Sequence, residues 1–396
     1  MKQKAKNIYA VLKREVRLIS KDVNLISILL LAPIFYSFFY GSIYINKVES
    51  DVKVTVVDMD RSNTSQKLIR MFDAHQLIAV ENVVGDYSRG RSEVESGDVQ
   101  GMIFIPKNFE ADLKSELGTD LKIYLNTTRF LVSNDINKSV NDVIATLSAG
   151  MRLKYFEVHG FSYNQAKEMI EPLRTDMRPM FNSIEGYGDF LIPSILILII
   201  HQTLLIGLSE SVSKERETNK LHELYDRSNQ STFAAIHGKG LFYAILFSAY
   251  TLFFFTINFT VFKIAQRGSA SALALLTVLM IVAVIYFSFF ISSFFKRKIT
   301  ALQFLTLTSY PIFLISGYSW PLEAMPFPLQ AISNLIPLTP YLNAFARITQ
   351  MGAGWNEVMP QIIHISVLIL VVSTATFFRM NKLFTAKTQL TTNHGD

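Results

Sequence analysis

Hydrophobic residues divide the chain into one isolated segment near the N-terminus and five further segments crowded into the second half. None of the six contains an acidic or basic residue, and each approaches or exceeds the ~20 residues that a helix needs to cross a bilayer. A stretch of mixed polarity separates the first segment from the others. The pattern predicts six membrane-spanning helices in a 1 + 5 order, over residues 23–45, 190–209, 240–262, 270–295, 299–320 and 361–378.

A basic amphipathic segment precedes the first span. Within residues 1–22, Val11 and Ile19 belong to an apolar stripe at helical spacing, with lysines and arginines beside or opposite it. This pattern is typical of a helix that lies on a membrane surface; a simple positive-inside anchor is the alternative. The first span, residues 23–45, is too long for a cleavable signal, so we expect a retained anchor.

Residues 46–188 have the composition of a water-soluble domain in which strand-like and helix-like stretches alternate. Ser62 and Asp86 are placed to cap two of the helices, and a longer helical stretch runs from about residue 133 to 159. We predict a membrane all-α bundle of six helices with an inserted α/β or α+β domain on helical stalks. The expected strands are Val52–Val57, Leu77–Val84, Met102–Ile105 and Leu121–Leu125.

The distribution of charge indicates the orientation. Charged residues are 18% of the 396, mean hydropathy is +0.27, and the net charge is +6. The basic clusters lie beside spans, which favours contact with membrane lipid over nucleic-acid binding. The positive-inside rule then places both termini in the cytoplasm, with residues 381–396 as a cytoplasmic tail, and residues 46–188 outside it. The clusters fall in residues 1–22, 210–239, 296–298 and 379–387, whereas the opposite short loops carry only Lys263, Arg267 and Arg347.

The sequence lacks the usual signatures of an enzyme. It has no cysteine, no phosphate-binding G-x-x-x-x-G-K-[ST] loop, no paired metal-ligand spacing and no G-x-S-x-G elbow. We therefore expect no catalytic residues, no bound metal and no cofactor in this chain. Charge-free spans also argue against an ion-coupled transporter. His201 and Gln202 are the most polar pair in the second span, placed either for an interhelical hydrogen bond or for contact with a substrate.

Two segments of residues 189–380 carry more specific signal. Residues 210–239 form a loop between the second and third spans, and their first part, 210–225, is dense in charges of both signs. Such a helix can dock into a groove of a soluble partner; a solvated extension of the second span is the alternative. Residues 319–350 contain five prolines together with apolar stretches too short to span. This predicts short re-entrant or interfacial helices, or else an external loop anchored at the interface.

The chain resembles the ABC-2 type permeases, the membrane subunits of certain ATP-binding-cassette exporters, in the bacterial subgroup with a large external domain after the first span. The resemblance covers nearly the whole chain. The sequence departs from the family pattern at Thr218-Asn219, where the family has Gly-Thr. The position at which the docking helix ends therefore does not follow from the resemblance. The matching stretches are Ser316-Gly317 with Pro321, Met325-Pro326 and Pro337-Leu338-Thr339, then Val57–Ser62, Gly97–Pro106 with Phe109, Lys214–Glu217, and Gly238-Lys239.

The resemblance implies a multi-pass subunit of the bacterial inner membrane that works as a dimer with a second copy or a paralogue. It further implies cytoplasmic ABC ATPase subunits that bind the ATP and Mg, and a periplasmic adaptor. The substrate would be amphipathic, lipid-like or drug-like, in outward efflux. It assigns coupling to the ATPase to Glu215, Arg216, Glu217 and Lys220. It assigns an external gate to Gly317, Trp320, Pro321, Met325, Pro326, Pro337 and Thr339.

Two other classes of function stay open at this point. A non-transporting scaffold or receptor would use the external domain to bind a ligand, and charge reversal at Glu215 and Glu217 would leave it active. An ion-coupled secondary transporter would depend on an ion gradient without ATP.

Overall fold

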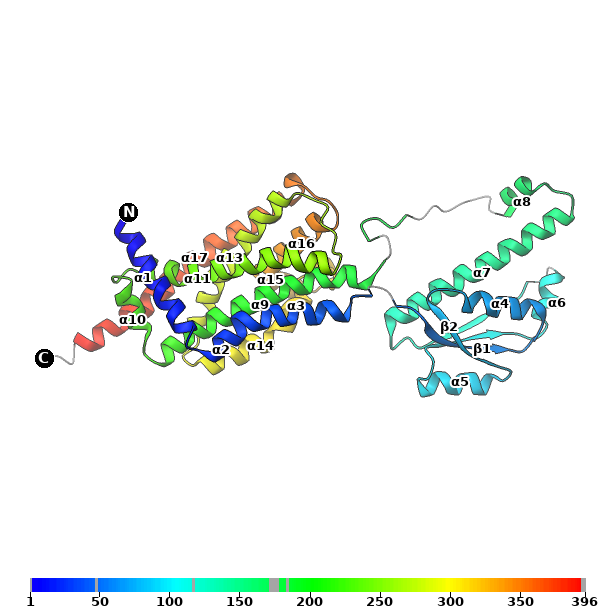
Figure 1. Ribbon diagram of the computed structural model, residues 1–396, viewed down its shortest axis with the longest axis horizontal. Helices are drawn as coiled ribbons and strands as arrows, with labels where there is room; N and C mark the ends of the chain where they lie inside the picture. The colour runs from blue at the N-terminus through cyan, green and yellow to red at the C-terminus, as the bar shows by residue number, and fades with distance from the viewer. Residues whose placement is uncertain (1, 47–48, 116–117, 171–177, 183–184, 393–396) are drawn as a thin grey trace. The chain divides into compact units, whose positions relative to one another are not determined.

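The computed structural model describes residues 2–46, 49–115, 118–170, 178–182 and 185–392 (Figure 1). The chain divides into two compact units. A helical unit comprises Met1–Lys47 and Pro179–Asp396, and an inserted unit comprises Val48–Arg178. Each unit has a hydrophobic core of its own.

The helical unit begins with α1 (Lys2–Ile19). A first membrane-length helix follows, built from α2 (Val23–Ile26), the wider π turn η1 (Ser27–Leu31) and α3 (Ala32–Ile43). Its remaining helices follow the inserted unit. They are α9 (Tyr187–Glu217), α10 (Leu221–Arg227), α11 (Thr232–Phe253), η2 (Phe254–Asn258), α12 (Phe259–Val261), α13 (Ala270–Ser292), α14 (Lys298–Ile315), η3 (Leu322–Ala324), α15 (Phe327–Asn334), α16 (Leu338–Thr349) and α17 (Trp355–Thr392).

Six helices among the described residues are long and apolar enough to cross a membrane, as the hydrophobic pattern predicts. The limits expected for the second and third spans were wrong at the ends that face each other. The second helix continues to Glu217 and the third already begins at Thr232. Both can extend because several charged residues there find partners inside the protein, as described below.

The second membrane helix, α9, is the axis of the bundle. Its most hydrophobic stretch is 83% buried, against 17% for α14 and 22% for α17, and it packs against α3, α11, α13, α14 and α16. Close packing requires a small residue at Gly207, where a Cβ atom would lie 2.4 Å from Leu29 Cδ2. A displacement of α9 would therefore disturb most of the bundle.

The basic clusters gather at one end of the helical unit. Lys214 pairs with Asp22 beside the N-terminal helix, and the Lys298 N–H donates to Glu217 Oε2 at 2.9 Å. Tyr225 stacks on Phe384 of α17 with ring centroids 4.9 Å apart. The structure thus brings together the segments that charge counting assigns to one side. Which side of the membrane this is stays a prediction.

The tail predicted over residues 381–396 is helical as far as it is described. The helix α17 runs to Thr392, and Phe384 within it is 1% exposed. Residues 393–396 lie outside the described part of the chain.

The proline-rich segment folds into the short helices expected of it, η3, α15 and α16. Gly317 ends α14 at a φ of +81°, where a Cβ atom would lie 2.3 Å from Leu322 Cδ1. Pro326 and Pro337 stand at the N-caps of α15 and α16, where a missing N–H is least costly. Most of α16 is buried against α13 and α17.

The inserted unit contains a four-stranded sheet in the order β2-β1-β3-β4. Strand β1 pairs in parallel with β2 and β3, and β4 pairs antiparallel with β3. All four strands lie where the sequence predicts them. The elements are β1 (Val52–Asp58), α4 (Asn63–Asp73), β2 (Ile78–Val84), α5 (Tyr87–Ser96), β3 (Gly101–Ile105), α6 (Phe109–Lys114), β4 (Lys122–Leu125), α7 (Phe130–Val158) and α8 (Tyr163–Ile170).

Helices cover both faces of this sheet, which makes the unit α/β. The chain passes from β1 to β2 on one side and then back past β1 to β3, so right-handed crossovers place α4 and α5 on opposite faces (Figure 1). Ser62 Oγ accepts from the Ser65 N–H at 3.1 Å and Asp86 Oδ2 from the Arg89 N–H at 3.3 Å, confirming both predicted caps.

The long helix α7 is only partly the stalk that the sequence suggests. Its first half packs on the sheet through Ile136, Val140, Val143 and Leu147, on the same face as α4. The apolar positions of that half recur at three- and four-residue spacing, so they belong to the core of the unit.

Candidate functional site

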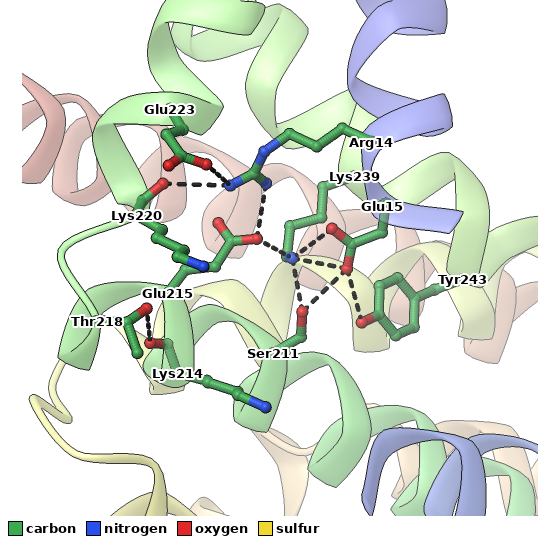
Figure 2. A network of polar contacts seen from close by, with 10 residues as sticks. All are labelled: Arg14, Glu15, Ser211, Lys214, Glu215, Thr218, Lys220, Glu223, Lys239 and Tyr243. Carbon is green, nitrogen blue, oxygen red and sulfur yellow. Dashed lines mark hydrogen bonds and ion pairs between the residues drawn. The ribbon is translucent and has the colours of Figure 1, made fainter. Parts of the chain in front are cut away.

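The most heavily charged buried region lies where α1, α9 and α11 meet (Figure 2). Side chains from the three helices form one connected set of hydrogen bonds and ion pairs, and we call this set the ionic cluster. It consists of Arg14, Glu15, Ser211, Glu215, Lys239 and Tyr243.

Lys239 is the centre of the ionic cluster. Its ammonium lies 2.7 Å from each carboxylate oxygen of Glu15, 2.7 Å from Ser211 Oγ and 3.1 Å from Glu215 Oε1. Lys239 and Glu15 have no exposed surface. Ser211 Oγ and Tyr243 OH also donate to Glu15 Oε1, at 2.9 and 3.1 Å. An ammonium has three donors, and here all of them have acceptors.

Arg14 connects this buried centre to α10. Its Nη1 lies 2.8 Å from Glu215 Oε1, and its Nη2 donates to the Lys220 carbonyl at 3.3 Å. The same Nη2 lies 3.6 Å from Glu223, whose side chain is 62% exposed. One guanidinium thus contacts the end of α9, the turn after it, and α10.

The local sequence explains how α1 reaches α11. Val11, Glu15 and Ile19 recur every four residues, so they form one buried stripe of α1. Opposite this stripe stands Gly238, where a Cβ atom would lie 2.6 Å from Val11 Cβ and 2.8 Å from the Ile8 carbonyl oxygen. Only glycine allows this approach, and the next residue along α11 is the lysine that binds Glu15.

The ionic cluster is balanced in charge, with two carboxylates against one ammonium and one guanidinium. Buried ion pairs gain little net stability because desolvation offsets their attraction, but removing one member costs about 3–5 kcal/mol. Such a cluster therefore specifies one arrangement of the three helices. Glu215 Oε2 is buried without a partner among the described residues.

The ends of α9 and α10 are defined by asparagines. Asn219 has a φ of +56°; its N–H donates to the Arg216 carbonyl at 3.3 Å, and the Lys220 N–H donates to the Glu215 carbonyl at 2.8 Å. This is a Schellman cap with Asn at the left-handed position that glycine usually takes. Asn229, at the same φ, ends α10 in the same way. The departure from the family's Gly-Thr thus still terminates the helix sharply.

Three of the four predicted coupling residues bond within the chain. Glu215 belongs to the ionic cluster, and Arg216 donates to the carbonyls of Ser293 and Phe295 at 2.6 and 3.0 Å, capping α13. Glu217 accepts the Lys298 N–H described above. The Lys220 side chain is exposed, and this residue contributes its carbonyl to the contacts of Arg14. Contact of these four residues with an ATPase remains a prediction.

A second ion pair joins the start of the first membrane helix to α9. Asp22 caps α2 through the Asn24 N–H at 3.2 Å and pairs with Lys214. Partial burial alone would raise the pKa of Asp22, but the Lys214 ammonium outweighs it, and the pKa lies below its usual value. The ion pair fixes α1 and α2 at the same end of α9.

The predicted gate residues lie at the opposite end of α9. Ser333 Oγ donates to the Ile315 carbonyl at the end of α14 and lies 2.9 Å from Thr339 Oγ1. Tyr318 OH donates to the Phe190 carbonyl near the start of α9. Of the predicted set, Met325, Pro337 and Thr339 are buried, Gly317 is half-buried, and Trp320, Pro321 and Pro326 are exposed.

His201 and Gln202 lie between these two ends of α9 and are both buried. Ser309 Oγ of α14 donates to Gln202 Oε1 at 3.3 Å, so Gln202 makes an interhelical hydrogen bond. Neither ring nitrogen of His201, nor Gln202 Nε2, has a partner among the described residues. Buried polar groups without partners are uncommon in folded proteins, which marks this pair as a candidate for a further contact.

No direct signal in the sequence marks the central pair of this site. Glu15 is the one acidic residue of the basic N-terminal helix, and Lys239 directly precedes the expected third span. An acidic residue on an otherwise basic amphipathic helix was the available signal. The described residues contain no group of three or more His, Asp or Glu side chains that could hold a metal ion.

Comparison with known proteins identifies similar chains. The model of the ABC-2 family transporter proteins matches residues 24–380. The probable multidrug ABC transporter permease YbhR of Escherichia coli (strain K12) is 25% identical over 50% of this chain and 57% of its own length. The inner membrane transport permease YhhJ of the same strain is 23% identical, over 78% and 79%. The linearmycin resistance permease protein LnrN of Bacillus subtilis (strain 168) is 20% identical, over 89% and 94%. The chain thus spans little more than half the length of YbhR and most of the other two.

Replacing Lys239 with Met tests the ionic cluster. The change leaves Glu15 and Glu215 buried without their shared cation, so the thermal unfolding midpoint of the purified chain in detergent should fall by several degrees. The double variant Glu15→Met with Lys239→Met removes both charges and should recover most of the loss. Lys296→Met, which removes an exposed cation, is the control. An unchanged midpoint in Lys239→Met would contradict the burial of this charge.

Replacing Gly238 with Ala tests the seating of α1. The new methyl group would overlap the Ile8 carbonyl and Val11, so α1 must move away from α11. We expect faster trypsin cleavage within residues 2–19, measured by mass spectrometry of the released peptides. Gly150→Ala, where nothing lies within 4 Å of the added atom, is the control. Equal cleavage of both variants would show that α1 is held by other contacts.

Proposed function

The chain belongs to the ABC-2 transporter family, and on that premise we propose that it is the permease subunit of an ATP-binding-cassette exporter. Members of this family are membrane components of the transporter and are not themselves the ATPase. Relatives of this chain are named as multidrug and resistance permeases. ATP and Mg would then be bound by separate cytoplasmic ATPase subunits, with no cofactor in this chain.

One observation carries the proposal. The bundle's central helix α9 runs without a break to Glu217, where the ionic cluster joins it to α1, α10 and α11. At ~1.5 Å per residue its 31 residues extend for about 46 Å, enough to reach across a membrane. A force applied to α10 would therefore reach the far end of the bundle through one continuous helix, whose internal proline, Pro193, lies near that far end.

The ATPase would bind the exposed side of α10. Leu221 and Leu224 of this helix are buried against the bundle, whereas Glu223, Asp226 and Arg227 are exposed. Together with Lys220 these side chains form a mixed-charge docking surface. This surface replaces Glu215, Arg216 and Glu217 as the proposed polar contacts, because those three side chains are engaged within the chain.

ATP binding would bias the bundle between two arrangements. A ligand shifts such an equilibrium only through contacts that differ between the states. We assign those contacts to α10, and we assign to the ionic cluster the task of making α1, α9 and α11 move together. The segment around Ser333 and Thr339, which joins the end of α14 to α16, would then open or close the opposite end.

The remaining expectations complete the proposal. The end with α1 and α10 would face the cytoplasm, both termini would be cytoplasmic, and the inserted unit would be external, in a bacterial inner membrane. A second copy or a paralogue would complete the permease, and a periplasmic adaptor would meet the inserted unit. The names of YbhR and LnrN support a drug-like substrate for this chain, and its apolar spans suit an amphipathic or lipid-like one.

Reversing charges on the docking surface tests the ATPase assignment. Lys220→Glu and Arg227→Glu should each weaken retention of the ATPase on the tagged full-length chain about fivefold, as expected for a contact worth about 1 kcal/mol. The measurement is the amount of co-purified nucleotide-binding subunit, identified by its phosphate-binding loop. Lys67→Glu in the inserted unit makes the same charge change at an exposed site and is the control. Equal retention in all three variants would remove the ATPase contact from this surface, and absence of any co-purified nucleotide-binding subunit would argue for a scaffold or receptor.

Replacing His201 with Leu tests the polar pair inside the bundle. The change removes two buried nitrogens without partners, so the unfolding midpoint should stay the same or rise. If His201 meets the substrate or a second state, efflux of an amphipathic fluorescent dye should slow severalfold. Thr203→Val is the control, because Thr203 Oγ1 already bonds to the Ile199 carbonyl within the same helix. Undiminished efflux in His201→Leu would remove the pair from the pathway.

A further inference from the structure

The inserted unit contains a cavity of about 490 Å³ between α4 and the carboxyl ends of β1 and β2. The carboxyl ends of parallel strands are where open α/β sheets commonly bind small ligands. Two arginines, Arg61 and Arg70, line this cavity. The proposed transport function does not involve this cavity.

The turn after β1 places Arg61 in the cavity. Arg61 has a φ of +56°, a strained value for a residue with a side chain. Asp58 supports the turn: its Oδ1 accepts the N–H groups of Asp60 and Arg61 at 3.0 and 2.9 Å, and its Oδ2 accepts Ser65 Oγ at 2.8 Å. Asp58 also lines the cavity, but these three donors occupy its carboxylate.

A glycine makes room for the Arg61 guanidinium. Gly85 directly follows β2, and a Cβ atom there would lie 2.3 Å from Arg61 Nη2. The guanidinium therefore rests against the backbone at the end of β2. The turn at Arg61 and the absence of a side chain at Gly85 together allow the Arg61 guanidinium to lie at this edge of the sheet.

The two guanidiniums have no anion to pair with. Among the described residues, neither Arg61 nor Arg70 forms an ion pair, and both are exposed. Gln66 lies one helical turn before Arg70 and adds an amide to the same wall. Guanidinium groups bind phosphate through paired hydrogen bonds, and the two of them outweigh the Asp58 carboxylate, so the lining keeps an excess of positive charge for a phosphate group.

Part of the lining is apolar. Ile69 and Val83 line the cavity, and Val83 is 55% exposed although it belongs to a strand. A bound molecule would therefore present an anionic group to the arginines and a less polar part to these two side chains. Fully polar anions such as inorganic phosphate would use only half of the cavity.

We propose that this cavity binds the phosphate group of a small amphipathic molecule through Arg61 and Arg70. The phosphate could be supplied by a phospholipid headgroup or by a soluble phosphate compound, and the experiment below distinguishes these sources. The proposal does not depend on the transport function, because it concerns a binding site and is tested by binding.

The test is calorimetric titration of the purified full-length chain in neutral detergent. The probes are inorganic pyrophosphate, for a soluble source, and dihexanoyl phosphatidic acid, for a lipid headgroup. Arg61→Gln and Arg70→Gln should each weaken binding about tenfold, and binding should weaken as salt is raised. Binding of the lipid alone, or tighter binding of it, assigns the site to the membrane; binding of pyrophosphate alone assigns it to a soluble phosphate compound and overturns the amphipathic part of the proposal.

Two further variants complete the design. Gly85→Ala keeps both charges but fills the space that the Arg61 guanidinium occupies, so it should also weaken binding. If Arg61→Gln lowers the unfolding midpoint, Gly85→Ala tests the Arg61 contact in its place. Lys67→Gln removes an exposed cation from the same helix outside the cavity and should leave binding unchanged. Absence of binding by both probes, or an equal loss in Lys67→Gln, would overturn the proposal.

Discussion

A lysine without exposed surface keeps its charge only if acidic side chains surround it, and the helical unit is arranged to supply them to Lys239. Glu15 comes from α1 and Glu215 from α9, so the ammonium can be satisfied only when three helices meet in one arrangement. Gly238 gives α1 the close approach that this requires. Desolvation limits what such a cluster adds to stability, so its main effect is to fix geometry.

This constraint gives the N-terminal helix a place in the bundle. An amphipathic basic helix on a membrane surface could slide or detach, but α1 carries Glu15 into the protein and holds α10 through Arg14. Arg14 thereby links α10, which would meet the ATPase, to α9, the axis of the bundle. This ionic link adds to the covalent connection between the two helices. Movement of α10 alone would break the contacts of Arg14 with Lys220 and Glu223 and uncover Leu221 and Leu224, which favours movement of the whole end as one body.

Local signals made much of the fold predictable. Six apolar segments, four strands and the caps at Ser62 and Asp86 each depend on residues near one another in the sequence. The candidate site was less predictable, because Glu15 and Lys239 are 224 positions apart and nothing in either segment names its partner. The charged residues after the second span, considered alone, predict exposure to solvent, so the expected span ended at residue 209. In the fold several of them have partners inside the protein, and α9 continues to Glu217. The inward contacts of Glu215 and Arg216 in the predicted coupling segment could not be foreseen, because they depend on elements that only the fold brings near.

The central claim is that α1 and α10 move as one body with α9. The chain has no cysteine, so pairs of spin labels can be introduced without removing native thiols. Exposed positions Tyr9 on α1 and Asp226 on α10 suit one pair, and Asp226 with Trp320 at the opposite end suits a second. Distances measured by double electron–electron resonance, with the ATPase bound and with or without ATP, test the claim. The account predicts an unchanged Tyr9–Asp226 distance while the Asp226–Trp320 distance shifts; a shift in the first pair would contradict it.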